Sequence, residues 1–240
     1  MPTILISEKN PEQLFAKTAQ ALLQHLAPIA ADREVILGLC GGRSVVGLVK
    51  ALKTLASEGS TEYRDVFRRA QFFMIDERLV PLDHADSNYG MLEKNLFQEL
   101  VASSVVTQEQ LHPFTPDPKH TDYGTAEYSE QLTRYGGRFD AVVLGVGEDG
   151  HVAGLFPRHA TLQRHEPVFL SFFDSPKPPA GRMTATLPLL QEAGAAVLLF
   201  TGEAKREAWG RFNDPATPAH ECPSIFLKEN ERLIIATDLA

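Results

Sequence analysis

Asp149 and His151 stand two residues apart in a glycine-rich stretch, and together they are the best candidates for acid–base chemistry in this chain. A histidine exchanges protons near neutral pH, and a neighbouring carboxylate can orient its imidazole and stabilise the charged form. An apolar run, residues 139–144, precedes the pair and predicts a buried strand. Ligands of α/β proteins bind beyond the carboxyl ends of such strands. We expect a short helix to begin at the turn, and its dipole would favour the neutral imidazole, the form that acts as a general base.

The same stretch also has the G-x-G-x-x-G spacing of dinucleotide-binding turns, in Gly145, Gly147 and Gly150. That interpretation needs a full helix after the turn and an acidic residue at the end of the next strand. Pro157 breaks the following segment early, and Glu166 precedes its strand instead of ending it. We therefore favour a turn that presents an acid–base pair. An ordinary glycine turn with two solvated charges is the alternative that local spacing leaves open.

A second glycine turn is the first candidate for binding an anion. Gly41, Gly42, Arg43 and Ser44 lie between a predicted strand and a predicted helix. Small residues there allow backbone N–H groups to face a phosphate, and the helix dipole adds attraction. The alternative is a tight turn in which Ser44 is the N-cap of the helix. The G-x-x-x-x-G-K-[ST] spacing of a P-loop is absent.

Further cations lie near the ends of other predicted strands. Arg182 opens a strand-like segment, and Lys205 follows another strand closely. Each alone is typical of a solvated surface cation, but together they indicate a phosphate gripped from several sides. Asp76 and Arg78 also end a strand, and a surface charge cluster is the alternative for them.

Composition limits the classes of function. The chain has 240 residues, 43% of them hydrophobic, and a net charge of −8, which argues against a nucleic-acid partner. Cys40 and Cys222 are too few for a disulfide framework or a structural zinc site, and no H-E-x-x-H motif or Cys/His cluster predicts another metal. The N-terminus lacks the features of an export signal, and no run approaches the roughly 20 apolar residues of a membrane helix. We expect a cytoplasmic protein without a membrane segment.

Strand-like and helix-like patterns alternate along the whole chain, which predicts an α/β fold. Strands are expected at residues 34–40, 71–75, 139–144, 167–172, 183–187, 195–201 and 233–237. Helices are expected at residues 11–27, 44–55, 89–100, 122–135 and 203–212. We expect a single domain, residues 1–240, with a mostly parallel, Rossmann-like sheet and helices on both faces.

Four segments in this order resemble the 6-phosphogluconolactonases. They are LCGGRS (39–44), MIDERLVP (74–81) with SNY (87–89), LGVGEDGHVAGLFP (144–157), and RMTATLP (182–188) with TGEAK (201–205). The third is highly specific, and the others are individually modest. Val45 departs from the proline that is usual in the family after the first element.

The resemblance implies an enzyme of the pentose phosphate pathway that hydrolyses 6-phospho-D-glucono-1,5-lactone to 6-phospho-D-gluconate without a cofactor. It implies catalytic roles for His151, Asp149 and, at a developing oxyanion, Arg78. The residues that it assigns to substrate or phosphate binding are Gly41, Gly42, Arg43, Ser44, Asp76, Asn88, Arg182 and Lys205. Its partner would be a small phosphorylated sugar lactone, and we expect a monomer or weak homo-oligomer.

Two other functions stay open on the residues alone. The related glucosamine-6-phosphate deaminases share the Asp-Gly-His turn but carry an acidic residue where this chain has Phe156, which has no acid–base group. A non-catalytic sugar-phosphate-binding regulator would keep Arg182 and Lys205 but would not need the Asp149–His151 pair.

Overall fold

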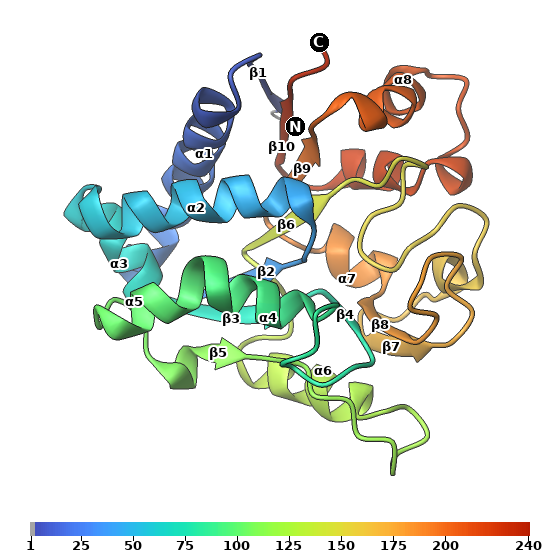
Figure 1. Cartoon of the computed structure of the whole chain (residues 1–240), viewed down its shortest axis with the longest axis horizontal. Helices are drawn as coiled ribbons and strands as arrows, with labels where there is room; N and C mark the ends of the chain where they lie inside the picture. The colour runs from blue at the N-terminus through green and yellow to red at the C-terminus, as the bar shows by residue number, and fades with distance from the viewer. Residues whose placement is uncertain (1–2) are drawn as a thin grey trace.

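A central parallel sheet organises the molecule (Figure 1). The computed structural model describes residues 3–240. Residues 1 and 2, which belong to the expected 1–240 domain and to the N-terminal segment for which no export signal is expected, lie outside the described residues. In spatial order the strands are β1 (Thr3–Ser7), β10 (Leu233–Thr237), β9 (Ala196–Phe200), β6 (Ala141–Gly145), β2 (Val35–Leu39), β3 (Ala70–Met74) and β5 (Leu111–His112). Every neighbouring pair is parallel. The expected α/β class with a mostly parallel sheet is confirmed.

The apolar runs form the buried centre of this sheet. Every residue of β2, β3, β9 and β10 is buried. Strands covered on both faces are almost continuously apolar, which explains why these segments are recognisable from the sequence. β1 alternates between exposed and half-buried residues at the edge of the sheet, and it has no counterpart among the expected strands.

Helices cover the sheet on both faces. The first group is α1 (Pro11–Asp32), α2 (Arg43–Glu58), α3 (Thr61–Arg69) and one continuous helix made of α4 (Asn88–Leu92), the π-helical turn η1 (Glu93–Phe97) and α5 (Gln98–Ala102). These helices pack against one another. The second group is α6 (Thr125–Arg134), α7 (Leu187–Gln191) and α8 (Arg206–Asn213). In Figure 1 the blue-to-green helices α1, α2, α3 and α5 lie apart from the orange α7 and α8.

The chain reverses its direction across the sheet between β2 and β6. From β2 it moves outward through α2 and α3 to β3, whereas from β6 it moves to β9 on the other side. Right-handed connections then place the first helix group on one face and the second on the opposite face. The loops that leave β2 and β6 diverge at this point. Such a switch point opens a crevice at the carboxyl ends of the strands, where α/β proteins bind ligands.

A small antiparallel sheet forms one side of that crevice. Its strands are, in order, β4 (Asp76–Arg78), β8 (Arg182–Ala185) and β7 (Phe169–Phe172). Arg78 lies directly opposite Arg182 in the β4–β8 ladder. The strand expected at 183–187 therefore ends at Ala185, because Thr186 caps α7 and Pro188 fits its first turn.

Short 3-10 helices connect the remaining segments. They are η2 (Gln108–Gln110), η3 (Ala160–Gln163), η4 (Glu203–Lys205), η5 (Ala219–Glu221) and η6 (Pro223–Glu229). The helix expected at 203–212 is thus a 3-10 turn followed by α8. Among the helices of residues 3–240, none has the length and apolar character needed to cross a membrane.

Candidate active site

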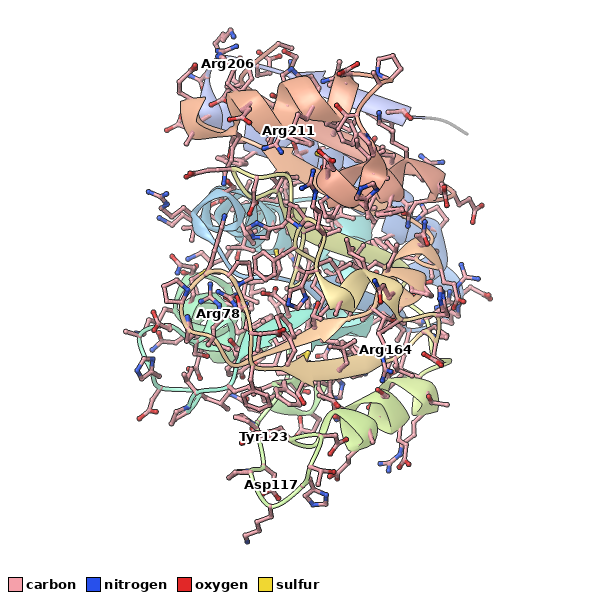
Figure 2. All side chains as sticks on the ribbon, turned by 90° about the vertical axis from the view of Figure 1, so that its right-hand side faces the viewer. Arg78, Asp117, Tyr123, Arg164, Arg206 and Arg211 are labelled. Atoms are coloured by element: carbon pink, nitrogen blue, oxygen red, sulfur yellow. The ribbon has the colours of Figure 1, made fainter. Side chains whose placement is uncertain are left out.

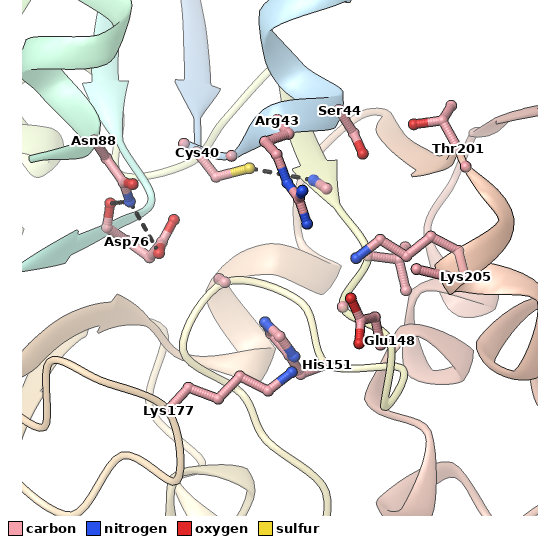
Figure 3. A pocket seen from close by; sticks show the side chains of 18 of the residues that line it. Cys40, Arg43, Ser44, Asp76, Asn88, Glu148, His151, Lys177, Thr201 and Lys205 are labelled. Atoms are coloured by element: carbon pink, nitrogen blue, oxygen red, sulfur yellow. Dashed lines mark hydrogen bonds between the residues drawn. The ribbon is translucent and has the colours of Figure 1, made fainter. Parts of the chain in front are cut away.

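A pocket of about 820 Å³ opens at the carboxyl ends of β2, β6 and β9, beside the small sheet. Ten of the eleven site residues expected from the sequence line it: Gly41, Gly42, Arg43, Ser44, Asp76, Arg78, Asn88, His151, Arg182 and Lys205. Figure 3 shows Arg43, Lys205 and His151 converging on the cavity from different segments. The eleventh residue, Asp149, is outside the lining and contacts the pocket through His151.

The acid–base pair is held in one tight turn. Nδ1 of His151 lies 2.5 Å from Oδ1 of Asp149. The turn is closed by the Gly147 amide, which donates to the His151 carbonyl at 2.8 Å. Gly150 has φ +86°, a conformation that glycine adopts without strain. A neutral imidazole that donates from Nδ1 keeps Nε2 unprotonated, and the ring faces the pocket (Figure 3).

The carboxyl group of Asp149 stays ionised in this setting. Burial by itself raises its pKa, but the hydrogen bond and charge of His151 and the charge of Lys177 outweigh burial and hold the pKa of Asp149 below its usual range. An ionised carboxylate can only accept hydrogen bonds, so it fixes the ring as an Nδ1 donor. The pair therefore has the arrangement of an oriented general base.

No helix begins at the turn, so the expected dipole effect on His151 is wrong. Residues 152–155 instead form a small loop closed by a bridge between Val152 and Leu155. The segment packs its apolar side chains in the core instead of continuing as a helix. The imidazole is thus oriented by its hydrogen bond to Asp149 and not by a helix dipole. A dinucleotide turn also needs that helix, so the structure agrees with the sequence in not favouring a cofactor fingerprint there.

Phe156 supports the His151 ring from behind. Its ring centroid lies 4.6 Å from that of the imidazole, with the planes 39° apart. The guanidinium carbon of Arg182 lies 5.7 Å from the same phenyl centroid. Phe156 is only 1% exposed, so it forms an apolar floor that holds two polar side chains in place.

The first glycine turn presents the N-terminus of α2 to the pocket. Gly42, with φ +114°, is the N-cap, so the alternative in which Ser44 caps the helix is wrong. The first N–H groups of a helix have no acceptor within the helix, and Arg43 and Ser44 occupy these positions at the pocket wall. A Cβ on Gly41 would meet the side-chain oxygen of Asn88 at 1.9 Å, which explains a glycine there. The turn can receive an anion.

Lys205 reaches the same part of the pocket from η4 (Figure 3). Burial lowers its pKa below the ordinary lysine value, and the nearby Lys177 and Arg43 charges act in the same direction, while Glu148 and Asp149 oppose them. The positive charges gathered here repel one another. A dianionic phosphate would relieve this repulsion.

The segment after β3 is buried, so the alternative of a surface charge cluster is wrong. Asp76 is 6% exposed and Glu77 is fully buried. Glu77 accepts hydrogen bonds from the amides of Arg78, Asn88 and Tyr89, and thereby fixes the start of α4. Sequence reasoning did not assign this role to Glu77, although an acidic residue inside a buried segment was the available signal.

Asp76 and the two arginines form a polar group with unused hydrogen-bonding capacity. The side-chain amide of Asn88 donates to Oδ2 of Asp76 at 3.1 Å. Within the described residues, Oδ1 of Asp76 and the Nε atoms of Arg78 and Arg182 are buried without a partner. Burial raises the pKa of Asp76, and the two arginine charges act against it. Buried polar atoms are normally satisfied, so these atoms indicate a polar ligand at this wall.

Lys177 completes the pocket and was not singled out by its sequence pattern. It lies in the Pro-rich loop 175–181, and its Nζ is 3.1 Å from Oδ2 of Asp149. The loop was recognisable from its prolines, but nothing in the spacing connects residue 177 with residue 149. Within residues 3–240, no group of three or more His, Cys, Asp or Glu side chains is placed to hold a metal ion.

Known proteins resemble this chain in sequence and in fold. The family model described as glucosamine-6-phosphate isomerases/6-phosphogluconolactonase matches residues 9–235. A 6-phosphogluconolactonase of Borreliella burgdorferi is 34% identical over 87% of this chain and 85% of its own length. One of Bos taurus is 35% identical over 85% of this chain and 79% of its own length. The crystal structure of a 6-phosphogluconolactonase from Thermotoga maritima superposes with a TM-score of 0.79 at 20% identity, covering 98% of this chain and 99% of that one, and shows the same fold. This chain belongs to the glucosamine-6-phosphate isomerase/6-phosphogluconolactonase family.

Proposed function

We propose that this pocket hydrolyses 6-phospho-D-glucono-1,5-lactone to 6-phospho-D-gluconate, a step of the pentose phosphate pathway. The observation that carries the proposal is the His151 imidazole, which faces the pocket while Asp149 holds its Nδ1 at 2.5 Å. The names of the relatives, 6-phosphogluconolactonase in Borreliella burgdorferi and Bos taurus, support the substrate. The chemistry needs only a positioned base, a positive oxyanion site and a phosphate site.

In the proposed mechanism, Nε2 of His151 takes a proton from water while the water oxygen attacks the lactone carbonyl. The carbonyl oxygen becomes an oxyanion in the tetrahedral intermediate. The imidazolium then gives its proton to the ring oxygen as the bond between that oxygen and the carbonyl carbon breaks. Asp149 stays ionised throughout and stabilises the imidazolium. The product is an open chain whose new carboxylic acid then releases its remaining water-derived proton to solvent and becomes a carboxylate.

In this proposal, one wall of the pocket binds the phosphate of the substrate and the opposite wall binds its lactone ring. Arg43, Ser44, Lys205 and the N-terminus of α2 take the 6-phosphate. The sequence grouped Arg182 with Lys205, but the structure pairs it with Arg78 in the β4–β8 ladder beside Asp76. Figure 3 shows Asp76 and Lys205 on opposite sides of the cavity. We therefore assign Arg182, with Asp76 and Asn88, to the oxygen atoms of the lactone ring.

Arg78 is the proposed oxyanion donor, because its Nε is buried at the pocket wall without a partner in the described part of the chain. Removing one such donor typically costs about 10²–10³ in kcat. We expect Arg78→Ala to lose activity on that scale in steady-state assays of lactone hydrolysis. A variant with the wild-type kcat would exclude the role.

The remaining properties follow as proposals of the same kind. We propose that residues 1–240 act as one domain, without a cofactor or metal, as a monomer or weak homo-oligomer. The net charge of −8 argues against a nucleic-acid partner. Two buried, unpaired thiols, Cys40 and Cys222, support a reducing cytoplasm.

Turnover of two substrates tests the function. We expect the protein to open freshly prepared 6-phosphogluconolactone in an assay coupled to 6-phosphogluconate dehydrogenase, at a rate well above the spontaneous hydrolysis measured in a blank. Glucosamine 6-phosphate should release no ammonia, because Phe156 provides no acid–base group. Ammonia release without lactone turnover would establish the deaminase alternative. Phosphosugar binding without either reaction would establish a regulator.

A further inference from the structure

The Asp149 carboxylate has a different partner on each oxygen. Oδ1 lies 2.5 Å from Nδ1 of His151, and Oδ2 lies 3.1 Å from Nζ of Lys177. The carboxylate therefore bridges a cation of the Pro-rich loop and the imidazole of the glycine turn. These two segments are distant in sequence, and this ion pair connects them at the pocket wall.

The loop that carries Lys177 is fixed by its own hydrogen bonds. The Ser175 hydroxyl donates to the Lys177 carbonyl at 2.8 Å and accepts from the Lys177 amide at 3.3 Å. The Arg182 guanidinium, which is 6% exposed as a residue, donates to the Pro178 carbonyl at 3.1 Å. The backbone at position 177 is thus held from two directions. A lysine on such a base samples fewer positions than one on an open loop.

Other charged or titratable groups surround the pair. Asp76 of β4 interacts with His151 through its charge, and Lys205 of η4 interacts with both Asp149 and Lys177. Cys222, which precedes η6, faces Asp149, and Glu148 of the same turn interacts with Lys205. In the portion of the chain that the structure describes, Lys177 forms an ion pair with Asp149 and Lys205 does not. Its side chain is 40% exposed, so the pair contributes little to global stability. Its effect is expected on the chemistry of its neighbours.

We propose that Lys177 is a positioning residue for the acid–base pair. Its ammonium occupies Oδ2 of Asp149, leaves Oδ1 for the imidazole, and opposes uptake of a second proton by the Asp149–His151 unit. This role deepens the proposed lactone hydrolysis and rests on it. The lysine does not react with the substrate. It holds the carboxylate so that Oδ1 faces Nδ1 of the imidazole.

Three variants test this role. Lys177→Met removes the charge at similar length, and Lys177→Arg keeps it. Lys119→Met is the matched control, because Lys119 is an exposed lysine in the loop with Asp117 and Tyr123, which Figure 2 shows projecting away from Arg78. Two readouts are used: the ¹H–¹⁵N titration of the His151 ring, assigned with a His151→Gln spectrum, and the pH dependence of kcat and KM for the lactone.

For Lys177→Met we expect the titration midpoint of the pair and the acid limb of kcat/KM to move upward by about half to one pH unit. KM at pH 8 should change less than about twofold, because uniform substrate binding is retained. Lys177→Arg should keep both midpoints near their wild-type values, and Lys119→Met should match the wild type.

Lack of lactone turnover by the wild type would refute the proposed function, while the ring titration would still decide on Lys177. An unmoved ring titration in Lys177→Met, or a raised KM with normal kcat, would overturn the positioning role.

Discussion

Gly147 lies so close to the His151 ring that a side chain there would collide with it. A Cβ on Gly147 would stand 1.9 Å from Nδ1 and 2.1 Å from Cε1 of His151, and 2.7 Å from Oδ1 of Asp149. Gly147 is not among the glycines with positive φ. The glycine is therefore needed for space beside the acid–base pair and not for an unusual backbone conformation.

We predict that Gly147→Ala lowers kcat for the lactone about 100-fold, because the ring must leave its bond with Asp149 and a misplaced catalytic group costs on that order. Steady-state kinetics measure the loss. Gly210→Ala is the control, since nothing lies within 4 Å of a Cβ on this glycine of α8. The control should keep full activity and gain roughly 0.4–1 kcal/mol of stability. Equal kinetics for the two variants would show that the ring tolerates displacement.

Lys205 is predicted to bind the phosphate and not to take part in the chemical step. Lys205→Ala should raise KM about tenfold or more while kcat falls little, the pattern of lost uniform binding. Lys50→Ala, on the exposed side of α2, should leave both constants unchanged. A reduced kcat with an unchanged KM would assign Lys205 to the reaction instead.

The same lysine predicts a pH effect with a definite sign. Because burial lowers the pKa of Lys205, its ammonium loses the proton at a lower pH than an ordinary lysine, and phosphate affinity falls as the pH rises through that value. KM of the wild type should therefore rise on the alkaline side. Lys205→Arg stays charged over this range and should show a flat KM. A parallel rise in both proteins would place the titrating group elsewhere.

His112, the last residue of β5, is predicted to destabilise the fold in acid. Its Nε2 donates to Gln71 at 2.7 Å, and its Nδ1 accepts from Gln131 at 2.8 Å, so the fold holds a neutral ring. Burial lowers the pKa of His112 to about 4 from 6.5. Above pH 6.5 the ring is neutral in both states and has no linkage effect. Between pH 6.5 and pH 4 the unfolded state binds one proton more than the folded state. The free energy of unfolding therefore decreases as the pH is lowered, by at most about 1.4 kcal/mol per pH unit.

Urea unfolding at pH 7 and pH 5 measures this loss. His112→Gln lowers stability at both pH values but should remove most of the pH dependence. His120→Gln, which alters a histidine with a side chain 61% exposed, should retain the wild-type dependence. If the free energy of unfolding of His112→Gln changes with pH as much as that of the wild type, the loss of stability in acid does not come from His112.

The sequence predicts the interior of this fold better than its edge and its loops. Strands β2, β3, β6, β9 and β10 are almost entirely apolar, with Gln71 and Thr237 as the polar residues, because both of their faces are covered. β1 contacts only one neighbouring strand and alternates between exposed and half-buried residues over five positions. The polar helix α3 buries only Val66 and Phe67. Such short, weakly patterned segments are decided by tertiary packing.

In the site too, features set by local sequence are predictable and features set by tertiary packing are not. His151 and the glycine turns are recognisable because their spacing is local in the chain. The missing helix after His151 was not predictable, because residues 152–156 are apolar in either conformation and the core determines which one forms. The contact of Lys177 with Asp149 depends on how the Pro-rich loop folds back, so it cannot be predicted from local spacing.

Replacement of the proposed base is the most direct measurement of the central claim. His151→Ala should hydrolyse fresh 6-phosphogluconolactone with a kcat about 10²–10⁴-fold below the wild type, after subtraction of the spontaneous rate. His120→Ala, which removes an exposed histidine outside the pocket, should keep the wild-type rate. Wild-type turnover by a correctly folded His151→Ala protein would contradict the assignment of His151 as the base that activates water.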